Sequence, residues 1–147
     1  MVKIMFSTQR GILSAIIRFF TWSRYSHVDF IVGPEYLIGP YPGVGTQREK
    51  VARRKQKASR WVICEFDASH EKMRAAMESI IGKPYDWGAI FGFVLRQDWQ
   101  DDRAWFCSEA IAWASRMAGT PLVTEKAWRV TSRDLLMSPR LRMVEKS

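Results

Sequence analysis

Cys107 is the residue of this sequence best placed to act as a nucleophile. It stands in WFCSEAIAW (105–113), where an apolar helical stripe begins. Free backbone N–H groups and the helix dipole at a helix start favour a thiolate, and they can also stabilise an oxyanion during acyl transfer. The stripe formed by positions 107, 110, 111, 114 and 118 is itself apolar, so the same pattern fits an ordinary core cysteine. A base close to the thiol would favour the catalytic role.

His27, one of two histidines in the chain, is the candidate base. It opens HVDFIVG (27–33), whose β-branched and aromatic residues predict a strand. An imidazole can accept a thiol proton near neutral pH, although a hydrogen-bonded structural histidine fits the same position. A zinc site built from both histidines and both cysteines is not expected, because none of the four forms a closely spaced pair. No metal and no cofactor are therefore predicted.

The elements that position these residues alternate between strands and helices. The turn at Gly33-Pro34 joins two of the strands into an antiparallel hairpin. The order predicts one α+β domain over residues 1–147, with an antiparallel sheet packed against segregated helices. Strands are predicted at 2–6, 27–33, 35–39 and 60–66, with an edge strand at 140–144, and helices at 12–20, 69–82, 85–95 and from Asp101 or Asp102 to Gly119.

The chain is basic, with a formal net charge of +8 and a pI near 9.9. Much of the excess lies in REKVARRKQKASR (48–60), which we interpret as a solvated loop, with contact to phosphate or anionic lipid as the alternative. No aromatic residue interrupts this run, so a nucleic-acid partner is not favoured. The helix at 12–20, flanked by Arg10 and Arg18, either packs on the sheet or lies on an anionic membrane surface.

Cysteine usage and hydropathy predict the compartment. Only two cysteines are present, which is typical of a reduced intracellular chain, and Cys64 is interpreted as a structural core thiol. The N-terminus is not expected to act as a signal peptide, because Gln9, Arg10 and Arg18 interrupt its apolar residues. No transmembrane helix is predicted, since no run of about 18 uninterrupted apolar residues occurs. These features predict a cytoplasmic protein.

Three stretches in order, SRYSHVDFIVG, GKPYDWGAIFGF and WFCSEAIAWA, resemble the circularly permuted papain-like NlpC-type cysteine hydrolases. That group includes the YiiX/YebB-like bacterial proteins, and lecithin:retinol acyltransferase is a distant relative. The resemblance spans residues 2–137 and implies a permuted papain-like fold with a small, open, barrel-like sheet. It also implies Cys107 as nucleophile, His27 as general base and Tyr85 as a substrate-binding residue near the cleft, although Tyr85 fits equally well as a core phenol.

The resemblance implies a cysteine peptidase-like or amidase-like hydrolase of bacterial or phage origin. Its substrate would be a cell-wall peptide or a lipid-linked acyl group, cleaved at an amide or ester bond by attack of the Cys107 thiolate. Acyl transfer to an amine instead of water, and the oligomeric state, remain open. The alternative is a catalytically weak or inactive member of the fold that binds an anionic partner through its basic loop.

The group that orients His27 is not identified by the sequence. Relatives commonly carry a polar residue on the next strand, but a two-residue turn places Pro42 opposite His27, in a stretch without a carboxylate. Asp29 projects to the same sheet face as His27 because strand side chains alternate, so it is one candidate. Tyr41, a backbone carbonyl and a water molecule are the others. With His27 nearby, we expect the pKa of Cys107 to fall below its ordinary value and that of Cys64 to rise.

Overall fold

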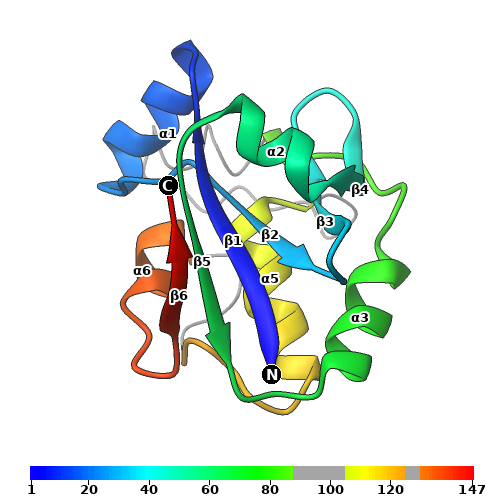
Figure 1. The fold of residues 1–147 in the computed structure, drawn as a ribbon. Helices are drawn as coiled ribbons and strands as arrows, with labels where there is room; N and C mark the ends of the chain where they lie inside the picture. The colour runs from blue at the N-terminus through cyan, green and yellow to red at the C-terminus, as the bar shows by residue number, and fades with distance from the viewer. Residues whose placement is uncertain (88–104, 125–129) are drawn as a thin grey trace.

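The computed structural model describes residues 1–87, 105–124 and 130–147, and six strands of this part form one antiparallel sheet (Figure 1). The strand order is β4-β3-β2-β1-β5-β6, so the sheet is open, with β4 and β6 at its edges. The strands are β1 (Val2–Gln9), β2 (His27–Ile31), β3 (Tyr36–Tyr41), β4 (Gly45–Lys50), β5 (Ala58–Phe66) and β6 (Arg142–Lys146).

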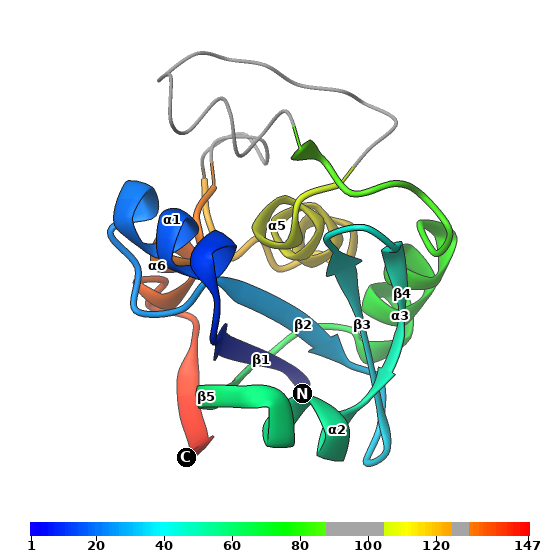
Figure 2. The ribbon, with the colours of Figure 1, turned by 90° about the horizontal axis from the view of Figure 1, so that it is seen from above.

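Helices cover both faces of this sheet. The larger apolar core lies on the face that carries α3 and α5, and a smaller cluster around Met5, Leu37 and Ile63 lies on the face that α2 covers. Figure 2 shows α5 and α2 on opposite sides of the sheet. The helices are α1 (Ile12–Thr21), α2 (Val51–Lys57), α3 (His70–Ser79), α5 (Cys107–Met117) and α6 (Ser132–Leu136).

The predicted α+β class with an antiparallel sheet is confirmed, and several local predictions hold. The helix after Ser69 forms as α3, and the Ser69 hydroxyl caps it by accepting a hydrogen bond from the Lys72 N–H. Met73, Ala76 and Met77 are buried along its stripe, as the periodicity predicts. The C-terminal edge strand is also present, as β6 against β5.

The interpretation of residues 48–60 as a loop is wrong, although most of these residues are exposed as predicted. This run ends β4, forms α2 and begins β5, and its residue Arg54 is only 4% exposed. Residues 51–57 contain no glycine or proline and are mostly good helix formers, which explains the local helix. The charge of the run predicted exposed side chains, but Arg54 is buried because it pairs with the buried carboxylate of Asp29.

The predicted hairpin register is wrong by one residue. Phe30 pairs with Ile38 and Ile31 with Leu37, whereas a two-residue turn would pair Gly33 with Tyr36. The N–H groups of Val32 and Gly33 instead both donate to the carbonyl of Tyr36, so the turn holds one more residue on the β2 side. This shift brings Tyr41, not Pro42, beside His27.

Most of the predicted helix at 85–95 falls on residues outside the described part. The predicted helix that runs from Asp101 or Asp102 to Gly119 is wrong in its first part, because Trp105 lies in a bridge and Phe106 is extended. Within the described part, Tyr85 forms an isolated parallel bridge with Trp105, and α5 begins at Cys107. No helix of the described ranges combines the length and hydropathy needed to cross a membrane.

Candidate active site

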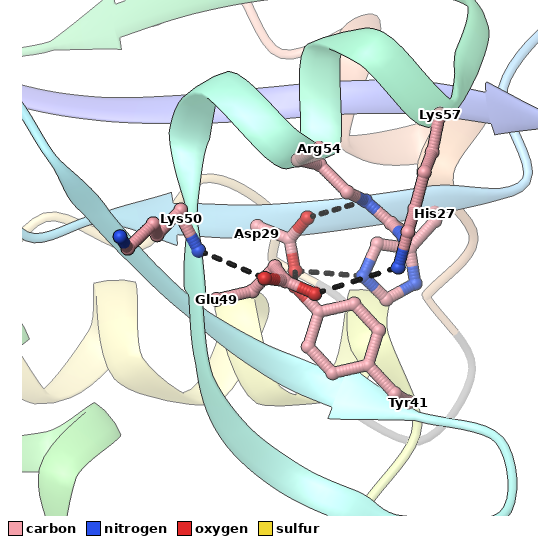
Figure 3. A network of polar contacts seen from close by, with 7 residues as sticks. All are labelled: His27, Asp29, Tyr41, Glu49, Lys50, Arg54 and Lys57. Atoms are coloured by element: carbon pink, nitrogen blue, oxygen red, sulfur yellow. Dashed lines mark hydrogen bonds and ion pairs between the residues drawn. The ribbon is translucent and has the colours of Figure 1, made fainter.

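His27 and Asp29 form a buried hydrogen-bonded pair on β2. They lie two residues apart on the strand and therefore on one face of the sheet. The Nε2 atom of His27 is 2.7 Å from Oδ1 of Asp29, and the two side chains are 7% and 0% exposed. The Tyr41 hydroxyl donates to the same Asp29 oxygen at 2.8 Å, and its ring stacks on the imidazole with centroids 4.9 Å apart. Asp29 is thus the side chain that holds His27 (Figure 3).

Arg54 completes this network from the opposite side of Asp29. Its Nε lies 3.3 Å from Asp29 Oδ2, and its guanidinium carbon lies 4.8 Å from the centre of the Tyr41 ring. In Figure 3, Arg54 reaches down from α2 to the carboxylate that β2 presents. Both charged side chains are almost fully buried, so each depends on the other for its electrostatic stabilisation.

Gly39 on β3 makes room for the pair. A Cβ atom at this position would lie 2.1 Å from Asp29 Oδ1 and 3.4 Å from His27 Nε2. Any other residue would therefore displace the carboxylate from the imidazole. A glycine inside a strand often marks such a close approach, and this is the signal in the sequence that points to the network.

The electrostatics of the network determine which nitrogen of His27 can act as a base. Burial favours the neutral forms of both groups, but His27, Arg54 and Tyr41 together hold the pKa of Asp29 below its usual value. The pKa of His27 is also lowered, mainly by burial and further by Arg54, against the opposing influence of Asp29. An ionised Asp29 can only accept, so the neutral imidazole carries its proton on Nε2 and leaves Nδ1 as the acceptor.

Cys107 is the first residue of α5 and is fully buried. The backbone N–H groups of Val28 and Ser108 hydrogen bond to its sulfur and favour the thiolate. Val28 follows His27 on β2, so the sulfur lies at the end of β2 that carries the histidine. The prediction that Cys107 lies in the first turns of a helix packed across the sheet with His27 is confirmed.

The two residues after Cys107 fix the start of α5. The Ser108 hydroxyl donates to the carbonyl of Val130 at 2.6 Å, which ties the helix start to the C-terminal segment. The Glu109 carboxylate accepts from the Phe106 N–H at 3.3 Å, a local cap of the kind that holds a first helical turn. Burial raises the pKa of Glu109 to about 8. These contacts position the thiol against β2.

The expected low pKa of Cys107 is contradicted by the structure. Burial raises the pKa of this thiol to about 12, and the hydrogen bonds from Val28 and Ser108 only partly offset it. Burial also raises the pKa of Cys64, to about 11, as expected for a core thiol. The helix start favours the thiolate, but the complete loss of solvent, which the sequence does not reveal, has the larger effect on the pKa of Cys107.

Tyr85 lies in the core beside the start of α5. It is 6% exposed, and its ring centre is 5.8 Å from that of Phe106 and 5.2 Å from that of Trp87. Burial raises its pKa, and Cys107, Asp86 and Glu109 raise it further, so the phenol stays protonated. Tyr85 is thus close to the thiol, and its role in binding substrate stays a prediction.

No protein-family model matches the chain, and no curated protein does. Among solved structures, the fold is similar to the crystal structure of metalloprotein YiiX from Escherichia coli O157:H7, described as DUF1105, with a TM-score of 0.77. The match covers 99% of this chain and 96% of that one, at 17% sequence identity. The chain has a YiiX-like fold. At this identity the YiiX comparison concerns the fold alone.

Proposed function

We propose that this chain is a thiol hydrolase of the permuted papain-like, NlpC-type kind, with Cys107 as nucleophile and His27 as base. The observation that carries the proposal is the 2.7 Å hydrogen bond from His27 Nε2 to the buried Asp29, on the strand whose next backbone N–H binds the Cys107 sulfur. A nucleophile, a base and a group that orients the base form the minimal arrangement for acyl transfer through a thioester.

Proton transfer begins the proposed reaction. His27 Nδ1 takes the proton from the Cys107 thiol while Nε2–H keeps its hydrogen bond to Asp29. The sulfur attacks the carbonyl carbon of an amide or ester, and the tetrahedral intermediate expels an amine or alcohol that receives the proton from Nδ1. Water, deprotonated by the same nitrogen, then attacks the thioester, releasing the acid and restoring the thiol.

At rest, the proposed nucleophile is a neutral thiol and the proposed base is a neutral imidazole. The pKa of Cys107 is raised to about 12 and that of His27 is lowered, so proton transfer at rest is unfavourable. General-base catalysis during attack, and not a preformed thiolate, is therefore the mode that these surroundings favour. Asp29 supports it by stabilising the imidazolium that forms transiently, and Arg54 and Tyr41 keep Asp29 ionised and in place.

A metal does not fit this site. YiiX is described as a metalloprotein. In the described residues of this chain, however, no three His, Cys, Asp or Glu side chains come together as a set that could hold a metal ion. Moreover, the Arg54 guanidinium lies at Oδ2 of Asp29, where it would oppose a bound cation. The mechanism therefore uses the side chains of the chain and no metal.

The substrate class we propose is a cell-wall peptide or a lipid-linked acyl group, cleaved at an amide or ester bond. The test is a screen of amide, ester and peptidoglycan-fragment substrates with the wild type, Cys107→Ala and Cys64→Ala. Both cysteines lie in the same core cluster, so Cys64→Ala is a matched control for loss of a buried sulfur. Loss of hydrolysis in Cys107→Ala alone supports the proposal, and equal rates in all three proteins contradict it.

A catalytically silent protein is the second candidate, and the complete burial of Cys107 favours it. In that case the basic residues of α2 would bind an anionic partner. Several of those charges have partners within the chain, including Arg54 with Asp29, Lys55 with Glu145 and Lys57 with Glu49. No turnover of any substrate, together with wild-type partner binding by Cys107→Ala, would favour the silent protein over the hydrolase.

A further inference from the structure

Helix α1 turns large apolar side chains toward solvent. Ile12 and Phe19 are 81% and 75% exposed, and Trp22, immediately after the helix, is 80% exposed. Ile16 and Phe20 add partly exposed surface at 37% and 38%. These residues recur at the spacing of one helical face and its end, so they form one apolar surface, which we call the α1 face.

The opposite side of α1 is anchored to the domain partly by polar contacts. The Ser14 hydroxyl lies 2.7 Å from that of Ser26, which precedes β2, and Ser14, Ile17 and Thr21 are the buried residues of the helix. Leu13 and Ile17 pack against the larger core from this side, so the usual inward placement of apolar residues is followed only in part. The apolar residues of the α1 face do not stabilise the isolated fold by burial.

The backbone conformation of Trp22 is a second feature of the α1 face, independent of its exposure. Its φ of 53° is the one positive value of a non-glycine residue in the described part of the chain. Trp22 is the C-cap of α1, and a bulky residue in this left-handed conformation is strained; residues strained in this way cluster at functional sites. A tryptophan held in this conformation and left in water is well suited to a membrane interface, where one part of an indole is apolar and the other is wet.

The charges around the α1 face select the kind of surface it would bind. No aspartate or glutamate precedes Asp29 in the sequence, whereas Arg10 and Arg24 lie exposed on either side of α1, and Arg18 lies on it, partly exposed. Apolar side chains surrounded by arginines match the interior and the anionic headgroups of a phospholipid surface.

We propose that the α1 face binds the surface of an anionic phospholipid membrane. This binding does not depend on the proposed hydrolysis. The surface is nevertheless close to the candidate site, because Ser26, which is hydrogen bonded to Ser14 of α1, directly precedes His27. Figure 2 shows α1 on the same side of the sheet as α5 and away from α2, so docking through α1 would turn the basic helix α2 away from the membrane.

Vesicle sedimentation at low salt tests the proposal, with phosphatidylglycerol/phosphatidylcholine vesicles compared with pure phosphatidylcholine. The wild type should bind the anionic vesicles more strongly. The variant Ile12→Ser/Phe19→Ser/Trp22→Asn should lose about tenfold or more in affinity, since burial of one large apolar side chain exceeds the free energy of a tenfold change. Asparagine tolerates the left-handed conformation at position 22, so the variant should fold normally.

Two further variants separate the charges of α1 from those of α2. Arg10→Gln/Arg24→Gln should weaken binding about thirtyfold, at about 1 kcal/mol for each arginine near an anionic surface. Arg53→Gln on α2, and Met137→Ser as a control for an exposed apolar residue, should bind as the wild type does. Equal vesicle binding by the triple variant and the wild type would overturn the proposal, as would a larger loss of binding in Arg53→Gln than in Arg10→Gln/Arg24→Gln. The proposal also fails if vesicles bind neither protein and the wild type instead forms a dimer that the triple variant abolishes.

Discussion

Cys64 and Cys107 lie in the same apolar core, yet their surroundings differ in kind. Cys64 stands within β5, opposite Ile4 and Met143, and burial is the one resolved influence on its pKa. Cys107 stands at a helix start, with two backbone hydrogen bonds to its sulfur and the charges of Asp29 and Arg54 close enough to act on its pKa.

The pKa of a buried thiol and the presence of polar groups beside its sulfur are two separate properties. Burial raises the pKa of both thiols, so ionisation at rest does not distinguish a nucleophile from a core residue in this fold. What distinguishes them is the polar machinery next to one of the two sulfurs. Substitutions in that machinery should change the behaviour of Cys107 and leave that of Cys64 unchanged.

Asp29→Asn should produce the largest loss of activity. The substitution keeps the shape of the side chain but removes the charge that fixes the imidazole tautomer, which in comparable triads lowers kcat by about 10⁴. The measurement is kcat on whichever substrate the screen identifies, with a thermal melt to follow folding. Tyr41→Phe is the control, because it removes one hydrogen bond to Asp29 and no charge. A rate for Asp29→Asn within tenfold of wild type would exclude Asp29 as the orienting group.

Arg54→Met should destabilise the fold by about 3–5 kcal/mol, because it leaves the buried Asp29 without its cationic partner. Arg54 also lowers the pKa of His27, so its removal should move the acid limb of the rate profile to higher pH. Arg54→Lys retains the charge and should keep the limb near its wild-type position. Urea unfolding and a pH–rate profile measure the two effects, and an unchanged limb in Arg54→Met would show that Arg54 acts through structure alone.

The free energy of unfolding should depend on pH through His27, with a smaller effect than that of Arg54→Met. The folded pKa of His27 lies below the ordinary value of 6.5, so its contribution is complete above about pH 6.5 and is lost as the pH falls through the lowered value. The pKa of Asp29 is lowered from 3.8, so its loss follows at more acid pH. Unfolding free energies between pH 7 and 5 should fall in the wild type and stay flatter in His27→Gln. Identical slopes would mean that His27 is not buried in its neutral form.

Much of the fold followed from local signals in the sequence. The Ser69 cap, the apolar stripe of α3 and the strand around His27 are each specified within a few residues. The one-residue register shift at Val32 and Gly33 was not predictable, because it depends on how two N–H groups share the Tyr36 carbonyl.

The two amphipathic helices show why the orientation of side chains was harder to predict. The sequence pattern predicted basic residues outward on 48–60 and offered inward packing for 12–20, but Arg54 points into the protein and Ile12 and Phe19 point out of it. The inward arginine depends on Asp29, which is 25 residues away in the chain, and no local pattern encodes that pairing. His27 and Asp29 were identifiable from strand alternation, whereas the burial that raises the pKa of Cys107 is a property of the whole core.

The pH dependence of Cys107 alkylation tests the central claim most directly. Iodoacetamide labelling of the folded protein, mapped by peptide mass, follows both cysteines in one sample. If His27 is the base for Cys107, labelling of Cys107 in the wild type should rise as His27 loses its proton. In His27→Ala it should rise only toward the thiol pKa of about 12, and the Cys64 profile should be unchanged. Superimposable Cys107 profiles in the two proteins would contradict the account.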